Sequence, residues 1–267
     1  MFELETKLST EQLAEFYDRG YVFLPQVFST QEVAGIGKAI DSLQEKAQGL
    51  EGEVEKYGSK FVVQEGLLER VVWAGGAEPV LLKYGRDPKI TSLAAQILRS
   101  KHAEHLINQV HLKLPGGGFY SWHQDSTHRG YDNYNHWVDI NGTGSYVQII
   151  TAIDEATLEN GPLLVIPHSC RKGHLNLPYD KKDKTKQTLS DKFNPAEAVP
   201  LLMKPGDVVA FGPYTIHGSE INNSDQPRRA FINGYASSGA NGKEYPGPKT
   251  HIERFVRLVS FEELNKR

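Results

Sequence analysis

The sequence predicts a mainly β protein, a barrel or sandwich of short strands with flanking α-helices that come chiefly from the N-terminal third. From about His105 the chain breaks into short runs that alternate or are β-rich, with Gly, Pro and Asn between them, which is typical of barrels and sandwiches. Before that point, apolar residues recur at helical spacing behind serine caps. A chain of 267 residues fits one domain of this kind.

Two helices and a strand are expected at the start of the chain. Ser9 with Gln12, and Ser29 with Glu32, have the capping-box pattern, in which each serine accepts from a backbone N–H and the later side chain reaches back. Each serine should therefore precede a helix. Residues 21–25 lie between the two helices and are aromatic and β-branched, which predicts a short strand.

Beyond these elements, the polar residues 49–61 are expected to form a loop, and residues 88–99 return to helical spacing. The pattern then changes to that of a β protein. The expected strands cover residues 106–114, 146–153, 163–167, 208–211 and 230–235.

We expect a single domain over residues 1–267. Residues 1–104 should form a helical and mixed support, and residues 105–240 the barrel core. Within that core, residues 179–197 are rich in lysine and almost without an apolar pattern, so a mobile insertion and candidate lid is expected there. Residues 241–267 are expected to be a C-terminal extension.

Composition argues against several classes of protein. A formal net charge of -3 provides no basic field for nucleic acid. Cys170 is the single cysteine, which rules out an internal disulfide and a thiolate zinc cluster. The N-terminus is charged, and no run approaches the roughly 18 apolar residues of a membrane span. We expect a cytoplasmic protein whose partner is a small-molecule substrate, without nucleic acid or membrane; no oligomeric state is predicted.

A candidate metal motif follows the glycine turn at residues 116–118. On a strand, His123 and Asp125 would point to the same face and could bind one ion together. Two histidines and one carboxylate on one face of an octahedron leave three positions open, which suits Fe(II) that must also bind a co-substrate and O2. With ten histidines in the chain, the motif alone is weak evidence and needs a third ligand.

Further stretches supply that context. Residues 211–219 contain His217, and Arg228 follows it after an Asn-Asn-Ser-Asp-Gln-Pro segment. These stretches, together with residues 8–25 and 159–167, resemble the phytanoyl-CoA dioxygenase superfamily of Fe(II)- and 2-oxoglutarate-dependent oxygenases over nearly the whole chain. The resemblance implies that the β core is a double-stranded β-helix, the jelly-roll or cupin-like fold.

The resemblance also implies roles for individual residues. His123, Asp125 and His217 would bind Fe(II), with 2-oxoglutarate as co-substrate and O2 as oxidant. Arg228 would pair with the distal carboxylate of 2-oxoglutarate, which suits a planar guanidinium that binds carboxylates through two bonds. Adjacent Arg229 should point to the opposite face of the strand and have a surface or structural role.

Other pocket residues are expected on neighbouring strands. Gln109, His111 and Lys113 should share a polar face. Gln109 corresponds to a glutamine that contacts the co-substrate in relatives, and Lys113 is a further candidate beside it. A half-exposed edge strand explains His111 and Lys113 equally well. Gln148 is expected to face the pocket and to touch co-substrate or substrate. The substrate mouth could be lined by Thr127, His128, Tyr131 and Tyr134, or these could form a solvated turn.

Two comparisons with the family pattern refine the expectation. Relatives usually have Pro-Gly-Ser-His where this chain has Pro167, His168, Ser169 and Cys170, which leaves the substrate contacts of that loop open. Halogenating relatives lack the motif carboxylate, so Asp125 favours hydroxylation or another oxidation. A second metal bound by loop histidines such as His168 is not expected.

The predicted function is therefore an Fe(II)- and 2-oxoglutarate-dependent dioxygenase that hydroxylates a small polar metabolite and releases succinate and CO2. One alternative is a Zn- or Mn-dependent hydrolase or isomerase on the same barrel. Another is a non-catalytic binding module. Arg228 discriminates against the hydrolase, which has no need of a guanidinium for the tail of a diacid.

Overall fold

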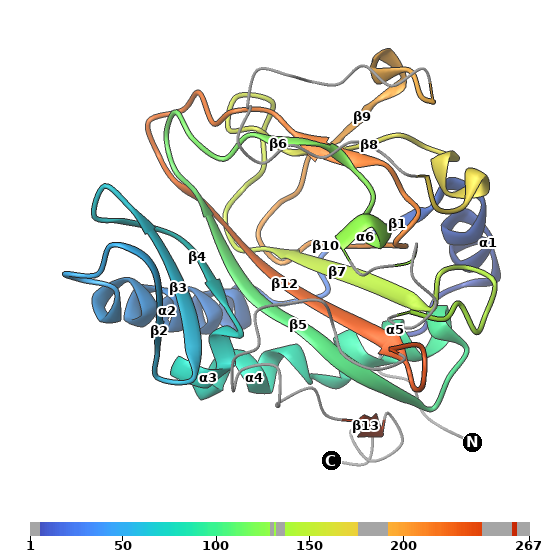
Figure 1. Ribbon diagram of the computed structural model, residues 1–267, viewed down its shortest axis with the longest axis horizontal. Coiled ribbons are helices and arrows are strands. Elements are labelled where there is room, and N and C mark those ends of the chain that lie inside the picture. The colour runs from blue at the N-terminus through green and yellow to red at the C-terminus, as the bar shows by residue number, and fades with distance from the viewer. Residues whose placement is uncertain (1–5, 129–130, 132–136, 176–191, 242–257, 261–267) are drawn as a thin grey trace.

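Two antiparallel sheets face each other in this protein, and helices cover the outer side of the larger sheet (Figure 1). The computed structural model describes residues 6–128, 131, 137–175, 192–241 and 258–260. The helices are α1 (Thr10–Arg19), α2 (Thr30–Lys46), α3 (Ala74–Ala77), α4 (Pro79–Gly85), α5 (Pro88–Leu98) and α6 (Asp125–His128), with 3-10 turns η1 (Ser169–Lys172) and η2 (Pro195–Glu197).

The strands within these residues divide between the two sheets. The larger sheet has the order β1 (Tyr21–Leu24), β10 (Val208–Phe211), β7 (Tyr146–Ala152), β12 (Arg228–Ser237), β5 (His102–Lys113), β4 (Leu67–Val72), β3 (Ser59–Gln64) and β2 (Gly52–Lys56), and β13 (Leu258–Ser260) also pairs with β5. The smaller sheet has the order β6 (Tyr120–His123), β11 (His217–Ser219), β8 (Leu163–Val165) and β9 (Val199–Leu201).

The chain winds between the sheets as a double-stranded β-helix. From β5 to β12 it supplies four neighbouring strands of the larger sheet, β5, β12, β7 and β10, and the four strands of the smaller one. This is the eight-strand arrangement of a jelly roll. The mainly β fold with flanking helices is thus confirmed, and β2 to β4 lengthen the larger sheet beyond its jelly-roll core.

The serine caps have the predicted effect. Ser9 and Ser29 both form complete capping boxes and precede α1 and α2, and β1 lies between those helices. The expectation of a loop at residues 49–61 is wrong, because β2 and β3 form a hairpin there. Tyr57 and Gly58 both have positive φ and make its two-residue turn, which matches the right-handed twist of paired strands.

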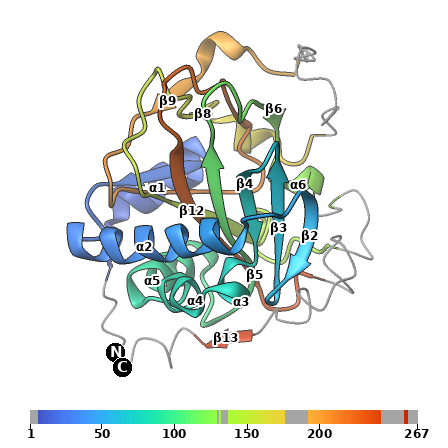
Figure 2. The ribbon, with the colours of Figure 1, turned by 90° about the vertical axis from the view of Figure 1, so that its left-hand side faces the viewer.

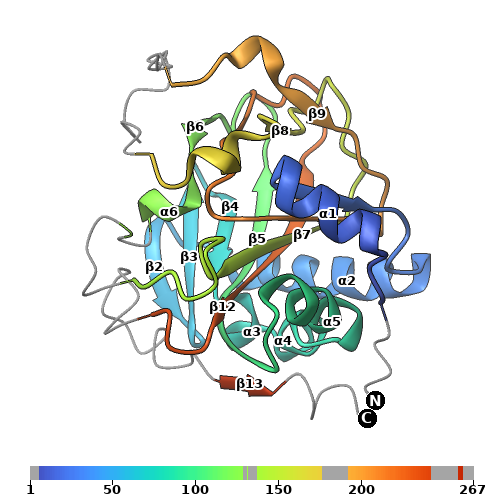
Figure 3. The same cartoon turned by 90° about the vertical axis from the view of Figure 1, so that its right-hand side faces the viewer.

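The helices pack on one face of the larger sheet, as Figures 2 and 3 show for α2 and α5. Ile36 and Ile40 of α2 and Leu93 of α5 are buried against Val110 of β5 and Phe231 of β12. Because side chains alternate along a strand, the residues between these apolar positions face the smaller sheet instead. The space between the two sheets therefore receives the polar side chains of β5 and β12.

A buried polar network joins β5 and β12 to the helical layer. His105 is fully buried between the rings of Trp73 and Tyr235 and lies 3.1 Å from Asn233 Oδ1. Asn108 donates to the same oxygen at 2.9 Å. Loss of hydration is the main reason that the pKa of His105 falls from 6.5 to about 3, with the charge of Arg86 adding to it; the histidine is neutral in the folded protein at neutral pH.

Stability should therefore fall in mild acid, and His105 should contribute to the loss. Between pH 6.5 and 3 the unfolded chain binds a proton at His105 that the folded chain does not, so unfolding becomes easier as pH falls. The expected contribution between pH 7 and pH 5 is about 2 kcal/mol. His105→Phe keeps the ring stacking and should reduce the loss by that amount in urea unfolding at both pH values. Equal losses in the two proteins would contradict this.

Three expected features fall mainly outside the described residues. Of the insertion at 179–197, residues 179–191 are not described; of the extension at 241–267, the structure describes Asn241 and the β13 pairing with β5. Tyr134 is not described either. Among the described helices, none is long and apolar enough to cross a membrane.

Candidate metal centre

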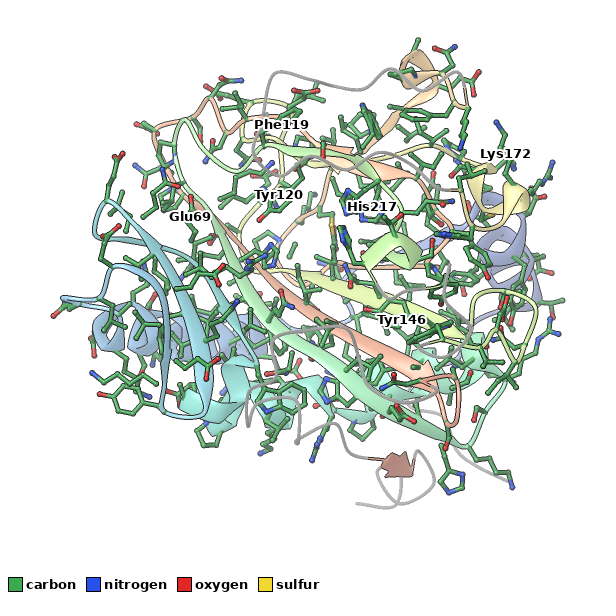
Figure 4. The ribbon with its side chains drawn as sticks, in the orientation of Figure 1. Glu69, Phe119, Tyr120, Tyr146, Lys172 and His217 are labelled. Carbon is green, nitrogen blue, oxygen red and sulfur yellow. The ribbon has the colours of Figure 1, made fainter. Side chains whose placement is uncertain are left out.

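His123 and His217 lie opposite each other on paired strands of the smaller sheet. His123 ends β6 and His217 begins β11, and the two residues are direct partners in the antiparallel register. Their ring centroids are 4.2 Å apart, and both side chains are buried. Figure 4 shows His217 on the side of its strand that faces the larger sheet. Two histidines distant in sequence thus face the space between the sheets together.

Asp125 joins the histidines in a way that differs from the expected strand alternation. Strand β6 ends at His123, and Asp125 begins the short helix α6. Its Oδ1 nevertheless lies 3.9 Å from His217 Nε2, less than twice a metal–ligand bond of about 2.1 Å. One ligand atom from each of His123, Asp125 and His217 lies within 4.8 Å of the others. The predicted cluster is present, and a turn of the backbone places its carboxylate.

Backbone carbonyls orient both imidazoles. His123 Nδ1 lies 2.7 Å from Ser121 O, and His217 Nδ1 lies 2.9 Å from Thr215 O. Each Nδ1 therefore carries the proton and donates it to a carbonyl two residues earlier, which leaves Nε2 as a lone-pair donor. Two imidazole nitrogens and one carboxylate are the donor set of a non-haem Fe(II) site with open positions, so these residues fit the expected ion.

Gln124 holds the turn between the two motif ligands. Its side chain is fully buried, and its amide nitrogen donates to Gly173 O at 2.9 Å and to Tyr214 O at 2.6 Å. Its Oε1 accepts from the backbone N–H of Leu175 at 2.6 Å. The residue between His123 and Asp125 thus anchors their turn to two other loops. This role was not predicted from the sequence.

The two adjacent arginines of β12 point to opposite faces, as predicted. Arg229 makes a bidentate ion pair with Asp154 at 2.8 and 2.9 Å and contacts Asp41 on the helical side. Arg228 faces the space between the sheets, where Nε and Nη2 donate to the carbonyls of Asn160 and Gly161. Loss of hydration lowers the pKa of Arg228, yet no carboxylate pairs with it among the described residues.

Lys113 lies beside Arg228 in the register of β5 and β12. Its ammonium donates to Gly161 O at 2.8 Å, Ser219 Oγ at 2.7 Å and Glu220 O at 2.5 Å, so its three N–H bonds all have protein acceptors. Burial, followed by the charge of Arg228, lowers its pKa to about 7. Lys113 therefore ties β5 to β11 and to the turn at Gly161, and adds positive charge beside Arg228.

A chain of hydrogen bonds orients Gln109. Tyr120 Oη lies 3.3 Å from His111 Nδ1, and His111 Nε2 lies 3.0 Å from Gln109 Oε1. Since Gln109 Oε1 can only accept, His111 carries its proton on Nε2 and accepts from Tyr120. The pKa of His111 falls to about 3, chiefly through loss of hydration and then through Arg70, Arg228 and Lys113. The Gln109 amide is thereby left with its two N–H groups to offer a ligand.

The remaining candidates have mixed placements. Gln148 faces away from the helices, and Tyr146 donates to its Oε1 at 2.8 Å. The His128 ring lies 5.2 Å from that of His123, so it adjoins the metal cluster. Tyr131 stacks on the ring of Trp137, whereas Thr127 Oγ1 is buried and has no hydrogen-bond partner among the described residues. Of these, His128 has a ring contact with one of the cluster's histidines.

The loop that departs from the family pattern is strained at one residue. His168 stands where the family pattern leads one to expect glycine, and its φ of 62° is left-handed, which costs roughly 1–2 kcal/mol for a residue with a Cβ. Its Nδ1 lies 3.1 Å from Asp18 O, whereas His174 Nδ1 lies 2.7 Å from Ser126 Oγ. The two loop histidines have separate partners, and the described residues contain no second metal cluster.

Known proteins resemble this chain over most of its length. The methylphosphonate hydroxylase of Gimesia maris is 28% identical, over 98% of this chain and 94% of its own. A probable α-ketoglutarate-dependent hypophosphite dioxygenase of Stutzerimonas stutzeri is 26% identical, over 86% and 79%. Among solved structures, EvdO2 of Micromonospora carbonacea complexed with 2-oxoglutarate has a TM-score of 0.65 and 26% identity, and covers 89% of this chain and 94% of its own.

These similarities confirm the expected class of enzyme and its cofactors, a dioxygenase that uses iron and 2-oxoglutarate. The family model of phytanoyl-CoA dioxygenase matches residues 16–230, which include β1, the metal cluster and Arg228. The chain belongs to the phytanoyl-CoA dioxygenase family.

Proposed function

We propose that this protein is an Fe(II)- and 2-oxoglutarate-dependent dioxygenase that hydroxylates a small polar metabolite and releases succinate and CO2. The observation that carries the proposal is the His123, Asp125 and His217 cluster on the same inter-sheet space as Arg228. Such a cluster leaves metal positions open for two oxygens of a 2-oxo acid and for O2. The guanidinium supplies a partner for the far end of the diacid.

Each residue has a distinct part in this proposal. His123, Asp125 and His217 would bind iron, which, when bound, supplies O2 activation and the coupled oxidation of co-substrate and substrate. Arg228 would bind the distal carboxylate of 2-oxoglutarate, and the free N–H groups of Gln109 would donate to the same molecule. Lys113 would act through its positive charge and by positioning the turn at Gly161, since its N–H bonds are engaged.

The relatives support a small, polar substrate. Two are named for methylphosphonate and hypophosphite, and a third is named a 2-aminoethylphosphonate dioxygenase. Others are named ectoine dioxygenases. Gln148, which faces the inter-sheet space, and His128, whose ring contacts that of His123, would contact the substrate. A cytoplasmic location is also proposed, because a lone cysteine is typical of a reducing compartment.

The alternatives explain fewer observations. A Zn or Mn hydrolase or isomerase could use the same three ligands, but it leaves Arg228, a half-buried cation without a carboxylate partner in the described part, with no anion to bind. A binding module has no need of three intact ligands with oriented imidazoles. The oxygenase accounts for both.

Succinate formation tests the proposal. The purified protein with Fe(II), ascorbate and 2-oxoglutarate should form succinate and consume O2, and an accepted substrate should raise the rate. Methylphosphonate, 2-aminoethylphosphonate and ectoine are the trial compounds, and succinate is measured by mass spectrometry. Zn(II) in place of Fe(II) should give none. Hydrolysis or isomerisation of a trial compound with Zn(II), without succinate, would overturn the proposal.

A further inference from the structure

A β-bulge in β4 turns two charged side chains toward the space between the sheets. Val62 of β3 pairs with Arg70, and Val63 pairs with Leu68, so Glu69 is an extra residue in β4. Leu68 and Val71 are buried in the core beneath the helices. Glu69 and Arg70 therefore both lie on the other face, which alternation without a bulge would not allow. Bulges often redirect side chains next to active sites.

Arg70 reaches the polar residues that adjoin the metal ligands. It is the direct partner of His111 in the register of β4 and β5. After burial, its charge is the next cause that lowers the pKa of His111, and it offsets part of the rise that burial causes in the pKa of Tyr120. Tyr120 lies on β6, the strand that ends at His123, and Figure 4 shows Tyr120 between Glu69 and His217. Arg70 thus faces the same inter-sheet space as the metal cluster, from the β4 side.

The guanidinium of Arg70 lacks a protein acceptor at its innermost atom. Its Nε is buried and has no hydrogen-bond partner in the described part of the chain, and no carboxylate there lies within ion-pair distance of it. A buried N–H of a cation that stays unpaired is costly, so such a group is usually completed by a ligand or an ordered water. Its position on the inter-sheet face, beside His111, favours a ligand.

The co-substrate alone does not account for this charge. Arg228 and Lys113 already face the space from β12 and the adjoining end of β5. Arg70 lies on the opposite side of β5 from Arg228 and pairs with His111, two residues before Lys113, the partner of Arg228. At normal strand spacing this separates the backbones of Arg70 and Arg228 by about 12 Å. The single distal carboxylate of 2-oxoglutarate needs one guanidinium, so Arg70 is left for a second anion.

We propose that Arg70 binds the negatively charged group of the primary substrate, a small molecule with a phosphonate or carboxylate group. The inference rests on the proposed dioxygenase function and specifies its substrate class. Arg70 would hold the oxyanion at the β4 side, with the bond to be oxidised directed at the metal cluster. Glu69, on the same face, would reduce the affinity for doubly charged anions and favour a substrate that also carries a positive or neutral end.

The test separates binding of the substrate from binding of the co-substrate. Under anaerobic conditions, the visible charge-transfer band of the Fe(II) and 2-oxoglutarate complex is titrated with methylphosphonate, 2-aminoethylphosphonate and acetate, and binding is measured in parallel by calorimetry. Neutral dimethyl methylphosphonate serves as the uncharged probe. Arg70→Met is compared with Arg228→Met, and Lys60→Met is the matched control, because Lys60 lies on the same sheet but is paired with Glu53 at 2.7 Å.

At least one anion should shift the band of the wild-type complex, whereas the neutral ester should not. Arg70→Met should lower the affinity for that anion at least about tenfold and leave the 2-oxoglutarate concentration for half-saturation within about twofold of the wild-type value. Arg70→Lys should recover part of the lost affinity, and Glu69→Gln should raise the affinity for the anion. Lys60→Met should leave the affinities for the anion and for 2-oxoglutarate unchanged.

Three results would overturn the inference. The first is a wild-type complex to which none of the anions binds, and the second is an Arg70→Met variant that binds the anion as well as wild type does. The third is an equal loss of 2-oxoglutarate binding in Arg70→Met and Arg228→Met, which would make Arg70 a co-substrate residue. If the wild-type band does not form at all, the dioxygenase function itself fails, so the two failures are distinct.

Discussion

Replacing His217 with alanine is expected to abolish Fe(II)-dependent succinate formation and to weaken metal binding by more than about 100-fold. The variant removes one of three protein donors, and even residues that only orient a ligand typically change metal affinity by about 10–100-fold. The side chain is buried, and its Nε2 lies 3.9 Å from Asp125 Oδ1. Anaerobic Fe(II) titration and succinate release measure the two effects.

His168→Asn is the matched control for that variant. His168 is a loop histidine whose Nδ1 contacts Asp18, and asparagine tolerates its left-handed backbone. The control should bind iron and form succinate as the wild-type protein does. Added imidazole should restore part of the metal binding in His217→Ala. Full turnover in His217→Ala would show that the iron lies elsewhere.

Arg228→Met should raise the KM for 2-oxoglutarate by about 100-fold or more, with a smaller effect on kcat. It removes a charge-assisted, two-bond contact to a buried carboxylate, and such contacts are worth about 3 kcal/mol. Lysine should recover little, because an ammonium cannot reproduce the planar fork. Succinate formation at varied 2-oxoglutarate concentrations measures the change.

Arg229→Met is the matched control on the same strand. Arg229 faces the helices and pairs with Asp154, so its loss should lower the free energy of unfolding by about 1–3 kcal/mol and leave the KM for 2-oxoglutarate unchanged. The two neighbouring arginines should thus separate co-substrate binding from stability. A KM increase in Arg229→Met as large as that in Arg228→Met would contradict the assigned faces.

Local patterns predicted much of this protein because the responsible interactions are local. The capping boxes at Ser9 and Ser29 join residues three positions apart, so the helix starts could be predicted from the sequence. Alternation on β5 and β12 likewise placed Arg228 and Arg229 on opposite faces. The resemblance to the family supplied His217 as third ligand, which no local pattern connects to β6.

The missed features depend on how segments pair. The expectation of a loop at residues 49–61 fails because β2 is polar and β3 shows its apolar residues only from Phe61 onward, although the Tyr57 and Gly58 turn is a usable hairpin signal. Asp125 converges on the histidines through a helical turn, which strand alternation does not describe. The bulge that exposes Arg70 to the inter-sheet space is defined only by its register with β3, so sequence spacing alone could not reveal it.

The most direct test of the central claim is the anaerobic visible spectrum of the metal-free protein after addition of Fe(II) and then 2-oxoglutarate. The account predicts a weak charge-transfer band that saturates with one Fe(II) per chain, is absent from His217→Ala and needs far more 2-oxoglutarate in Arg228→Met. A wild-type protein that forms no such band and instead binds Zn(II) or Mn(II) tightly would contradict it, and would favour the hydrolase or isomerase.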